Sequence, residues 1–230
     1  MAILKYSVLV GFAATILYVI PSYRGYLAIA PGGIPHNFLG YSLQAVGQPF
    51  AHRDTTSISS LQNAKWVAEY GPGLRTNFLY GELPVRKGDR ATVPGYVAPQ
   101  RQTSQTVDAA QVSRLNDYLK SIGKGKLSIK SSQLESPEYQ AVWVNEPSKY
   151  LSPTKGEIAH VHPEGSTHLV LSLADAEEAI SKGWAELHKL SGLLGRLPAS
   201  YVMVYAPRDE DEFKVWKKLV DAAADFNTAS

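Results

Sequence analysis

The spacing of apolar residues predicts helices in the middle and at the end of the chain. Apolar side chains recur three and four positions apart over residues 107–122, which gives a helix with one apolar stripe, begun by Thr106 or Asp108. The same spacing recurs over 210–226, where Asp209 supplies the N-cap. Each helix therefore has one face suited to packing against a sheet.

Shorter runs of apolar and β-branched residues predict strands at 127–130, 139–144, 157–161, 167–173 and 201–205. Residues 175–178 have the form of a capping box and start a short helix that stops at Gly183. Short turns, rather than a helix after every strand, join these runs, which favours antiparallel pairing over a doubly wound sheet. The predicted fold class is α+β, with a mainly antiparallel sheet flanked by helices.

The region before the first of these helices has a different pattern. Residues 71–105 are rich in glycine, proline and arginine and carry few periodic apolar positions, so we expect a long ordered loop with short strands. Arg86, Arg90 and Arg101 lie in it. These guanidinium groups are candidates to bind an anionic or enolic ligand, or else to be solvated or ion-paired.

The chain begins with a long uncharged stretch. Residues 6–20 contain no charge, and only Lys5 interrupts the run back to Ala2. A run of about 20 apolar residues spans a bilayer, and a lysine near its end reaches the interface. Pro21 and Arg24 end the stretch without a small-residue cleavage site. We expect an uncleaved transmembrane helix of undecided orientation; a signal peptide is the alternative.

The 230 residues thus divide into a membrane anchor over 1–22, an extended and loop-rich part over 23–105, and an α+β core over 106–230. The net charge is only +2 and no block of lysine and arginine stands out, so nothing points to nucleic acid. The chain has no cysteine, which excludes disulfides, thiolate catalysis and cysteine-ligated metals.

Histidines gather around one predicted hairpin. His160 and His162 are two positions apart, so on a strand their side chains share a face. A Pro-Glu-Gly-Ser turn follows, and the returning strand brings His168 back beside them. His188 comes soon after Trp184, further along the chain. The sequence therefore predicts a cluster of imidazoles at one edge of the sheet.

Such a cluster suits proton transfer or metal binding. Three histidines fit zinc or non-haem iron, but Glu164 follows directly after Pro163, unlike the usual cupin spacing. We expect a site without a metal and keep a metal-dependent enzyme as an alternative. Ser166 lies near the histidines, so a Ser/His hydrolase also stays open. The chain lacks the G-x-S-x-G, P-loop and G-x-G-x-x-G motifs.

Several motifs together resemble the fungal luciferase family. They cover residues 157–162, 167–171, 182–188 and 205–210, with upstream stretches at 23–26, 37–41, 83–90 and 100–102. The resemblance implies O2-dependent oxidation of 3-hydroxyhispidin, a pyrone with an enol and a catechol. The excited product loses CO2, emits light and leaves caffeylpyruvic acid. It also implies an oxidoreductase with O2 as co-substrate, no organic cofactor and a membrane anchor. We therefore expect a single-pass protein of the endoplasmic reticulum or another internal membrane.

The resemblance and the hairpin together give the expected site. The expected catalytic residues are His160, His162, His168 and His188. The expected substrate-binding residues are Arg208, Trp184, Tyr205, Glu157 and Arg101. A histidine base would remove the enol proton, since an enolate reacts with O2 far more readily than the enol. Whether this chain emits light stays open, and a non-luminous, membrane-tethered binding protein is the remaining alternative.

Overall fold

The computed structural model describes residues 17–229. The helices are a first one over 17–28, then α2 (Phe38–Gly47), α3 (Lys65–Tyr70), α4 (Ala109–Ile122), α5 (Leu173–Ser181) and α6 (Glu210–Thr228), with short 3-10 turns η1 (Gln48–Phe50), η2 (Pro72–Arg75) and η3 (Lys149–Thr154). The strands are β1 (Leu127–Ser131), β2 (Gln140–Val144), β3 (Glu157–Val161), β4 (Thr167–Val170), β5 (Ala185–Leu187) and β6 (Tyr201–Val204).

The strands form a single six-stranded sheet in the order β1-β2-β3-β4-β6-β5, and every neighbouring pair is antiparallel. The predicted α+β class with an antiparallel sheet is therefore confirmed. One prediction fails in its extent: the strand expected over 167–173 ends at Val170. The chain leaves the sheet there because Ser172 already caps the next helix. Strand β5 was not predicted.

Two of the three predicted helix N-caps are confirmed. Asp108 caps α4 and Asp209 caps α6, each by accepting a hydrogen bond from the backbone N–H three residues on, as predicted. For α5 the prediction was wrong, because the cap is Ser172, whose side chain accepts from the N–H of Asp175. Asp175 itself accepts the backbone N–H of Phe78 and so ties the loop before α4 to this helix.

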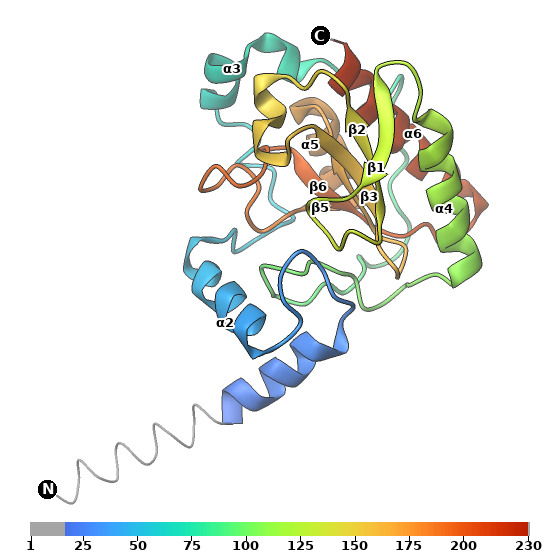
Figure 1. The fold of residues 1–230 in the computed structure, drawn as a ribbon. Coiled ribbons are helices and arrows are strands. Elements are labelled where there is room, and N and C mark those ends of the chain that lie inside the picture. Colours follow the sequence, from blue (N-terminus) through green and yellow to red (C-terminus); the bar gives the residue numbers. More distant parts are fainter. Residues whose placement is uncertain (1–16, 230) are drawn as a thin grey trace, which may run out of the picture.

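The sheet has one apolar face, which the helices cover. Helices α4 and α6 lie together on one side in Figure 1, and both contact β3. The side chains that alternate toward this side form one continuous core with the helices, for example Val142, Leu169 and Val202 of the sheet with Leu115 and Trp216. Burial of this face is the main source of stability for the fold.

The opposite face carries the histidines beside apolar residues and is covered by irregular chain. His160, His168 and Met203 lie side by side across β3, β4 and β6 on this face. Gln100 and Arg101, from the segment before α4, reach over it, and both are buried. This face therefore carries the titratable side chains, while the apolar core lies on the helix side.

The segment before α4 is ordered by its contacts. Residues 76–108 contain no helix or strand, so the short strands expected there are absent from this stretch. Its arginines are mostly structural: Arg86 pairs with Glu212, and Arg90 donates to the carbonyl of Ala185. Arg86 and Arg90 are therefore bound to groups within the protein, which agrees with the second alternative rather than with binding of an anionic ligand.

The N-terminal prediction falls mostly on residues 1–16, which lie outside the described residues. The helix over 17–28 runs past Pro21 and Arg24 and ends only beyond them. It pairs with α2 below the sheet in Figure 1, joined by an edge-to-face contact of Tyr26 with Tyr41. Among residues 17–229, the structure has no helix with the length and apolar character of a membrane span.

Candidate active site

The β3–β4 hairpin brings three histidines together as predicted. His160 and His168 are directly opposite in the register, and the turn closes with the N–H of His162 bonded to the carbonyl of Ser166. The ring centroids lie 5.1 Å apart for His160 and His162, 5.2 Å for His160 and His168, and 4.7 Å for His162 and His168. Gly165 takes a φ of +97° in this turn, a conformation that glycine adopts without strain.

The fourth histidine completes the group from the neighbouring strand. His188 comes directly after β5, and its ring centroid lies 5.5 Å from that of His168. Tyr201 stacks on His168 with centroids 4.6 Å apart and an interplanar angle of 23°. His160, His162 and His168 are 1–2% exposed and His188 is 8% exposed. The structure thus gathers all four predicted histidines in one buried cluster.

A β-bulge aims Glu157 at this cluster. Val142 pairs with Ala159 but Trp143 pairs with Glu157, so Ile158 is an extra residue in β3. Because of this extra residue, Glu157 lies on the same face as His160, and Ile158 lies in the apolar core. The Glu157 carboxylate then accepts a hydrogen bond of 2.7 Å from Nδ1 of His160. Glu157 was predicted to bind substrate, and the structure instead places it behind a histidine.

Each hairpin histidine has its Nδ1 side tied to an acceptor. Nδ1 of His160 donates to Glu157, and Nδ1 of His168 donates to the carbonyl of Val202 at 3.2 Å. Nδ1 of His162 lies 2.7 Å from Oγ of Ser166, whose hydroxyl donates to Glu164. With Nδ1 protonated in all three rings, each Nε2 points toward the interior of the cluster and carries a lone pair whenever its ring is neutral.

A carboxylate, Glu135, faces the hairpin histidines. It lies in the loop between β1 and β2, and its side chain is 7% exposed. Arg101 holds it with two hydrogen bonds, of 3.1 Å and 2.6 Å. Oε1 of Glu135 lies 3.7 Å from Nε2 of His160 and 3.7 Å from Nε2 of His162. Arg101 is 1% exposed, so it positions this carboxylate from within the protein.

These groups could hold a metal ion. Ligand atoms of Glu135, His160, His162 and His168 all lie within 4.8 Å of one another. We call these four residues the quartet. His188 lies outside it, because its Nδ1 accepts the backbone N–H of Leu190 at 3.0 Å.

The buried environment shifts the pKa values of the histidines in opposite directions, so they carry different charges. Burial lowers the pKa of His160, but Glu135 and Glu157 outweigh it and raise the pKa to about 9. Burial, together with nearby positive charge, holds the pKa values of His162 and His168 well below the usual value. Burial raises the pKa of Glu135, but His160 and Arg101 outweigh it and hold the pKa well below its usual range.

His188 is also neutral, since burial lowers its pKa to about 3. At neutral pH the cluster therefore contains one imidazolium, three neutral imidazoles and at least one carboxylate. It has both proton acceptors and positive charge within one buried space.

Glu164 connects the cluster to a small cavity. The cavity has a volume of about 310 Å³, and Arg101, Glu164, Thr106 and Ile29 are among its lining residues. Burial raises the pKa of Glu164, and its Oε2 is buried without a hydrogen-bond partner. Glu164 lines the cavity and also accepts from Ser166, the partner of His162, so it links this cavity to the histidines.

Three other predicted residues lie elsewhere. Trp184 donates its indole N–H to the carbonyl of Pro84, and Tyr205 donates its hydroxyl to Glu186. Arg208 pairs with Glu212 and is about one-third exposed. No contact described here joins any of the three to a histidine of the cluster. The structure therefore does not bring them into the walls of this site.

Glu135 and Glu164 were not predicted as site residues. Glu135 follows an unremarkable Ser-Ser-Gln-Leu stretch, and only the fold brings its loop over the histidines. For Glu164 the sequence does hold an indication, because a carboxylate two positions after His162 lies in the same tight turn. The cupin pattern concerns metal ligands and does not bear on the role of Glu164 as the acceptor for Ser166.

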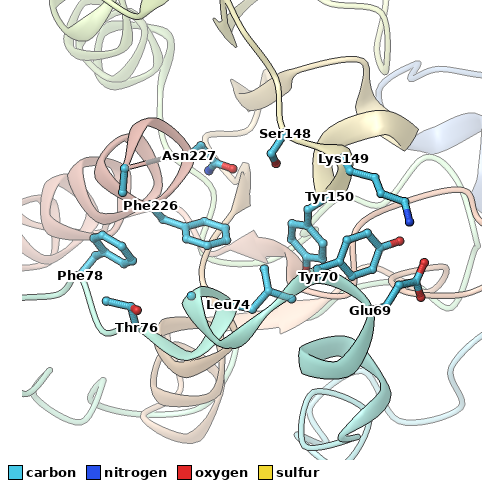
Figure 2. Close-up of a pocket in the computed structure, with 12 residues that line it drawn as sticks. Glu69, Tyr70, Leu74, Thr76, Phe78, Ser148, Lys149, Tyr150, Phe226 and Asn227 are labelled. Atoms are coloured by element: carbon cyan, nitrogen blue, oxygen red, sulfur yellow. The ribbon is translucent and has the colours of Figure 1, made fainter.

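A wider, aromatic cavity lies apart from this cluster. Its volume is about 630 Å³, and Tyr70, Phe78, Tyr150 and Phe226 line it, with Lys149 and Glu69 at one end (Figure 2). No histidine and no member of the quartet lines it. Its walls are largely aromatic, and it contains none of the titratable groups of the cluster. We refer to it as the aromatic cavity.

Comparison with known proteins gives a consistent result. The Luciferase domain family matches residues 155–223, which include the hairpin and all four histidines of the cluster. A luciferase of Neonothopanus nambi is 27% identical over 224 residues, covering 90% of this chain and 80% of that protein. A luciferase of Armillaria mellea is 26% identical over 229 residues, covering 92% and 82%. No solved structure matches.

Proposed function

Because these comparisons support the assignment of the chain to the fungal luciferase family, we propose that it is an oxidative enzyme that acts at the histidine cluster on 3-hydroxyhispidin or a related enolic pyrone. The relatives imply a luciferase-like enzyme with a small-molecule substrate. The observation that carries the proposal is the convergence of four histidines within the matched segment.

The proposed reaction combines the pyrone with one molecule of O2 and releases CO2. The substrate and O2 together contain the same atoms as caffeylpyruvic acid and CO2, so no external electron donor is required. The O–O bond breaks, and so do the bond from the enol carbon to the lactone carbonyl and the bond from the ring oxygen to its other carbon. The lactone carbonyl leaves with the ring oxygen as CO2, and the two atoms of O2 stay in the opened product. Energy released in this step would leave the product in an excited state, which is the source of any light.

The first chemical step would be loss of the enol proton. A neutral imidazole, His162 or His168, is suited to accept it, because an enolate formed nearby favours the protonated ring. The positively charged His160 would stabilise the enolate beside it. A positioned base of this kind contributes roughly 10²–10⁴-fold to the rate.

Burial suits an oxidation with a reactive intermediate. The hairpin histidines are 1–2% exposed, so a peroxide formed among them would be shielded from water. The substrate would enter from the cavity lined by Arg101 and Glu164. That cavity is small, so entry requires the covering residues near Ile29 and Thr106 to move.

A serine hydrolase is less well supported by the same atoms. Ser166 is fully buried and its hydroxyl donates to Glu164 rather than to a histidine. A nucleophilic serine normally faces the substrate and donates to its base. The hydroxyl here orients His162, which is a positioning role.

The direct test is to mix the purified full chain with 3-hydroxyhispidin in air and to follow O2 uptake, absorbance and light. We expect O2 to be consumed in an equal amount to the pyrone, with release of CO2. Light is a separate readout, since oxidation without emission still fits the proposed chemistry. No O2 uptake with this substrate or related enolic pyrones would overturn the proposal.

We also infer that the N-terminal part lies at a membrane. Large apolar side chains of the first helix and α2 face outward, and Leu17, Phe38, Leu39 and Val46 are 60–75% exposed. Exposed apolar surface of this extent marks an interaction site. It begins within the uncharged stretch over 6–20.

Deleting residues 1–22 tests this part. We expect the shortened chain to leave the membrane fraction and to stay folded, as judged by its circular dichroism melt. A folded chain that still sediments with membranes, and does so through neither residues 1–22 nor α2, would contradict the inference. In that chain, Leu39→Glu would separate binding through α2 from other binding, with Leu194→Glu as the control at another exposed leucine.

A further inference from the structure

We propose that the quartet, Glu135, His160, His162 and His168, binds one divalent transition-metal ion. The site would have three imidazole nitrogens and one carboxylate oxygen as protein ligands. It rests on the geometry of the described residues and does not depend on the proposed reaction. The expectation of a site without metal came from the spacing of Glu164, which is not a member of the quartet.

The two distances from Glu135 to the histidines match those around a single ion. Metal–nitrogen and metal–oxygen bonds to such ligands are about 2.0–2.2 Å long, so two ligands of one ion lie roughly 3–4 Å apart. The separations of 3.7 Å from Glu135 to His160 and to His162 fall in this range. Such a separation is too long for a direct hydrogen bond and suits two atoms that share a third.

The rings are held in the tautomer that a metal requires. Three different acceptors fix the outer nitrogens: a carboxylate for His160, a hydroxyl for His162 and a backbone carbonyl for His168. Metal-binding histidines in proteins typically donate their second N–H to such a partner, which fixes the ring and raises its basicity. Here every hairpin histidine has this second partner.

The inner atoms lack partners of their own. Eight buried side-chain nitrogen and oxygen atoms in residues 17–229 have no hydrogen-bond partner, and four of them belong to this cluster or touch it. These four are Nε2 of His160, Nε2 of His162, Nε of Arg101 and Oε2 of Glu164; the last two lie 3.7 Å from each other as an ion pair, whereas the two Nε2 atoms both face Glu135. A buried polar group without a partner costs about 1–3 kcal/mol. Two such nitrogens aimed at one carboxylate indicate that something binds between them.

The ligand set points to a class of ion. Imidazole nitrogen suits zinc, iron, copper, nickel and cobalt, whereas magnesium and calcium prefer sites made only of oxygen. The chain has no cysteine, so no thiolate competes for a softer ion. We therefore assign the site to a divalent first-row transition metal with mixed nitrogen and oxygen ligands.

The ion would change one step of the proposed reaction. With their Nε2 atoms bound to the ion, His162 and His168 would no longer be free to act as the base; the ion would acidify the enol and stabilise its oxygen as a Lewis acid, in place of the charge on His160. This consequence rests on the proposed function, whereas binding of the metal does not. Failure of one is therefore distinguishable from failure of the other.

The test is a titration of the chelator-treated full chain with Co²⁺, in the absence of substrate. We expect a visible absorption band that saturates at one Co²⁺ per chain, and retention of one transition metal per chain after purification, by mass spectrometry. Wild-type protein that binds no Co²⁺ tightly enough to survive gel filtration would overturn the proposal, whatever its activity.

Variants locate the site. His162→Ala and Glu135→Gln should each weaken binding by about tenfold or more, and Glu135→Gln keeps the size of the side chain so that the fold is preserved. The matched controls are His188→Gln, next to the quartet, and Glu138→Gln, an exposed carboxylate on the same loop. Melts monitored by circular dichroism identify unfolded variants. Binding that survives in folded His162→Ala and Glu135→Gln, or is lost equally in both controls, would contradict the assignment.

Discussion

The two faces of the sheet differ in what buries them and in what they do. On the helix side, apolar strand residues such as Leu169 and Val202 pack against α4, α5 and α6. On the other side, buried histidines and glutamates lie under irregular chain. Regular, apolar burial makes the first face stable and chemically inert. The second face holds polar groups whose hydrogen bonds fix their orientation, which is what a reaction site requires.

The largest effect is expected from His162→Ala on the polar face. Turnover of 3-hydroxyhispidin should fall by roughly 10²–10⁴-fold, as expected for loss of a positioned base. The fold should persist, because the neighbouring strand pairing is made by the backbone. Oxygen uptake and a thermal melt on the same sample check this, with His36→Ala, whose ring packs against Tyr26, as the control. An unfolded variant, or a folded one with normal turnover, would contradict it.

On the helix face, Leu169→Ala should act in the opposite way. The side chain is fully buried in the core, so its loss should lower the free energy of unfolding by about 2–5 kcal/mol. Turnover per folded molecule should stay near that of the wild type. Denaturant unfolding and an active-site titration separate the two. The comparison of the faces fails if activity drops while stability is kept.

Glu157→Gln should give an intermediate effect. The carboxylate holds His160 and also accepts the hydroxyl of Ser132 and the N–H of Gln133. Partners behind a reacting or ligating histidine are typically worth about 10–100-fold in activity or metal affinity. We expect that loss in kcat with little change in KM. A change confined to the melting temperature would show that Glu157 is purely structural.

The smallest effect is expected from Arg208→Ala. Arg208 was predicted to bind substrate, but it forms a partly exposed ion pair with Glu212 on the helix α6. Such pairs contribute about 0–1 kcal/mol to stability. Turnover should stay within about twofold of the wild type, measured by steady-state kinetics. A loss of about tenfold or more would place Arg208 in the site despite its position.

The sequence predicted the parts of the fold that depend on local pattern. The caps Asp108 and Asp209, the antiparallel pairing and the meeting of His160 with His168 all follow from spacing and turn chemistry. Strand β5 was not predicted, since three residues carry too little pattern to show a period.

The rest of the site depends on contacts between distant residues. Glu135 meets the histidines because Arg101, more than 30 positions earlier, holds its carboxylate, while Ser132 and Glu157 hold its loop. The bulge that turns Glu157 toward His160 also leaves no mark in the sequence. Conversely, Trp184, Tyr205 and Arg208 were grouped with the site by motif alone, and the structure gives each a partner elsewhere.

The most direct measurement is a crystal structure of the protein with hispidin, the same pyrone without the enol that reacts. The account predicts that the pyrone ring binds against the histidine cluster, next to Arg101 and Glu164. Hispidin bound instead in the aromatic cavity of Figure 2, between Tyr70 and Phe226, with the histidine face unchanged, would contradict the central claim.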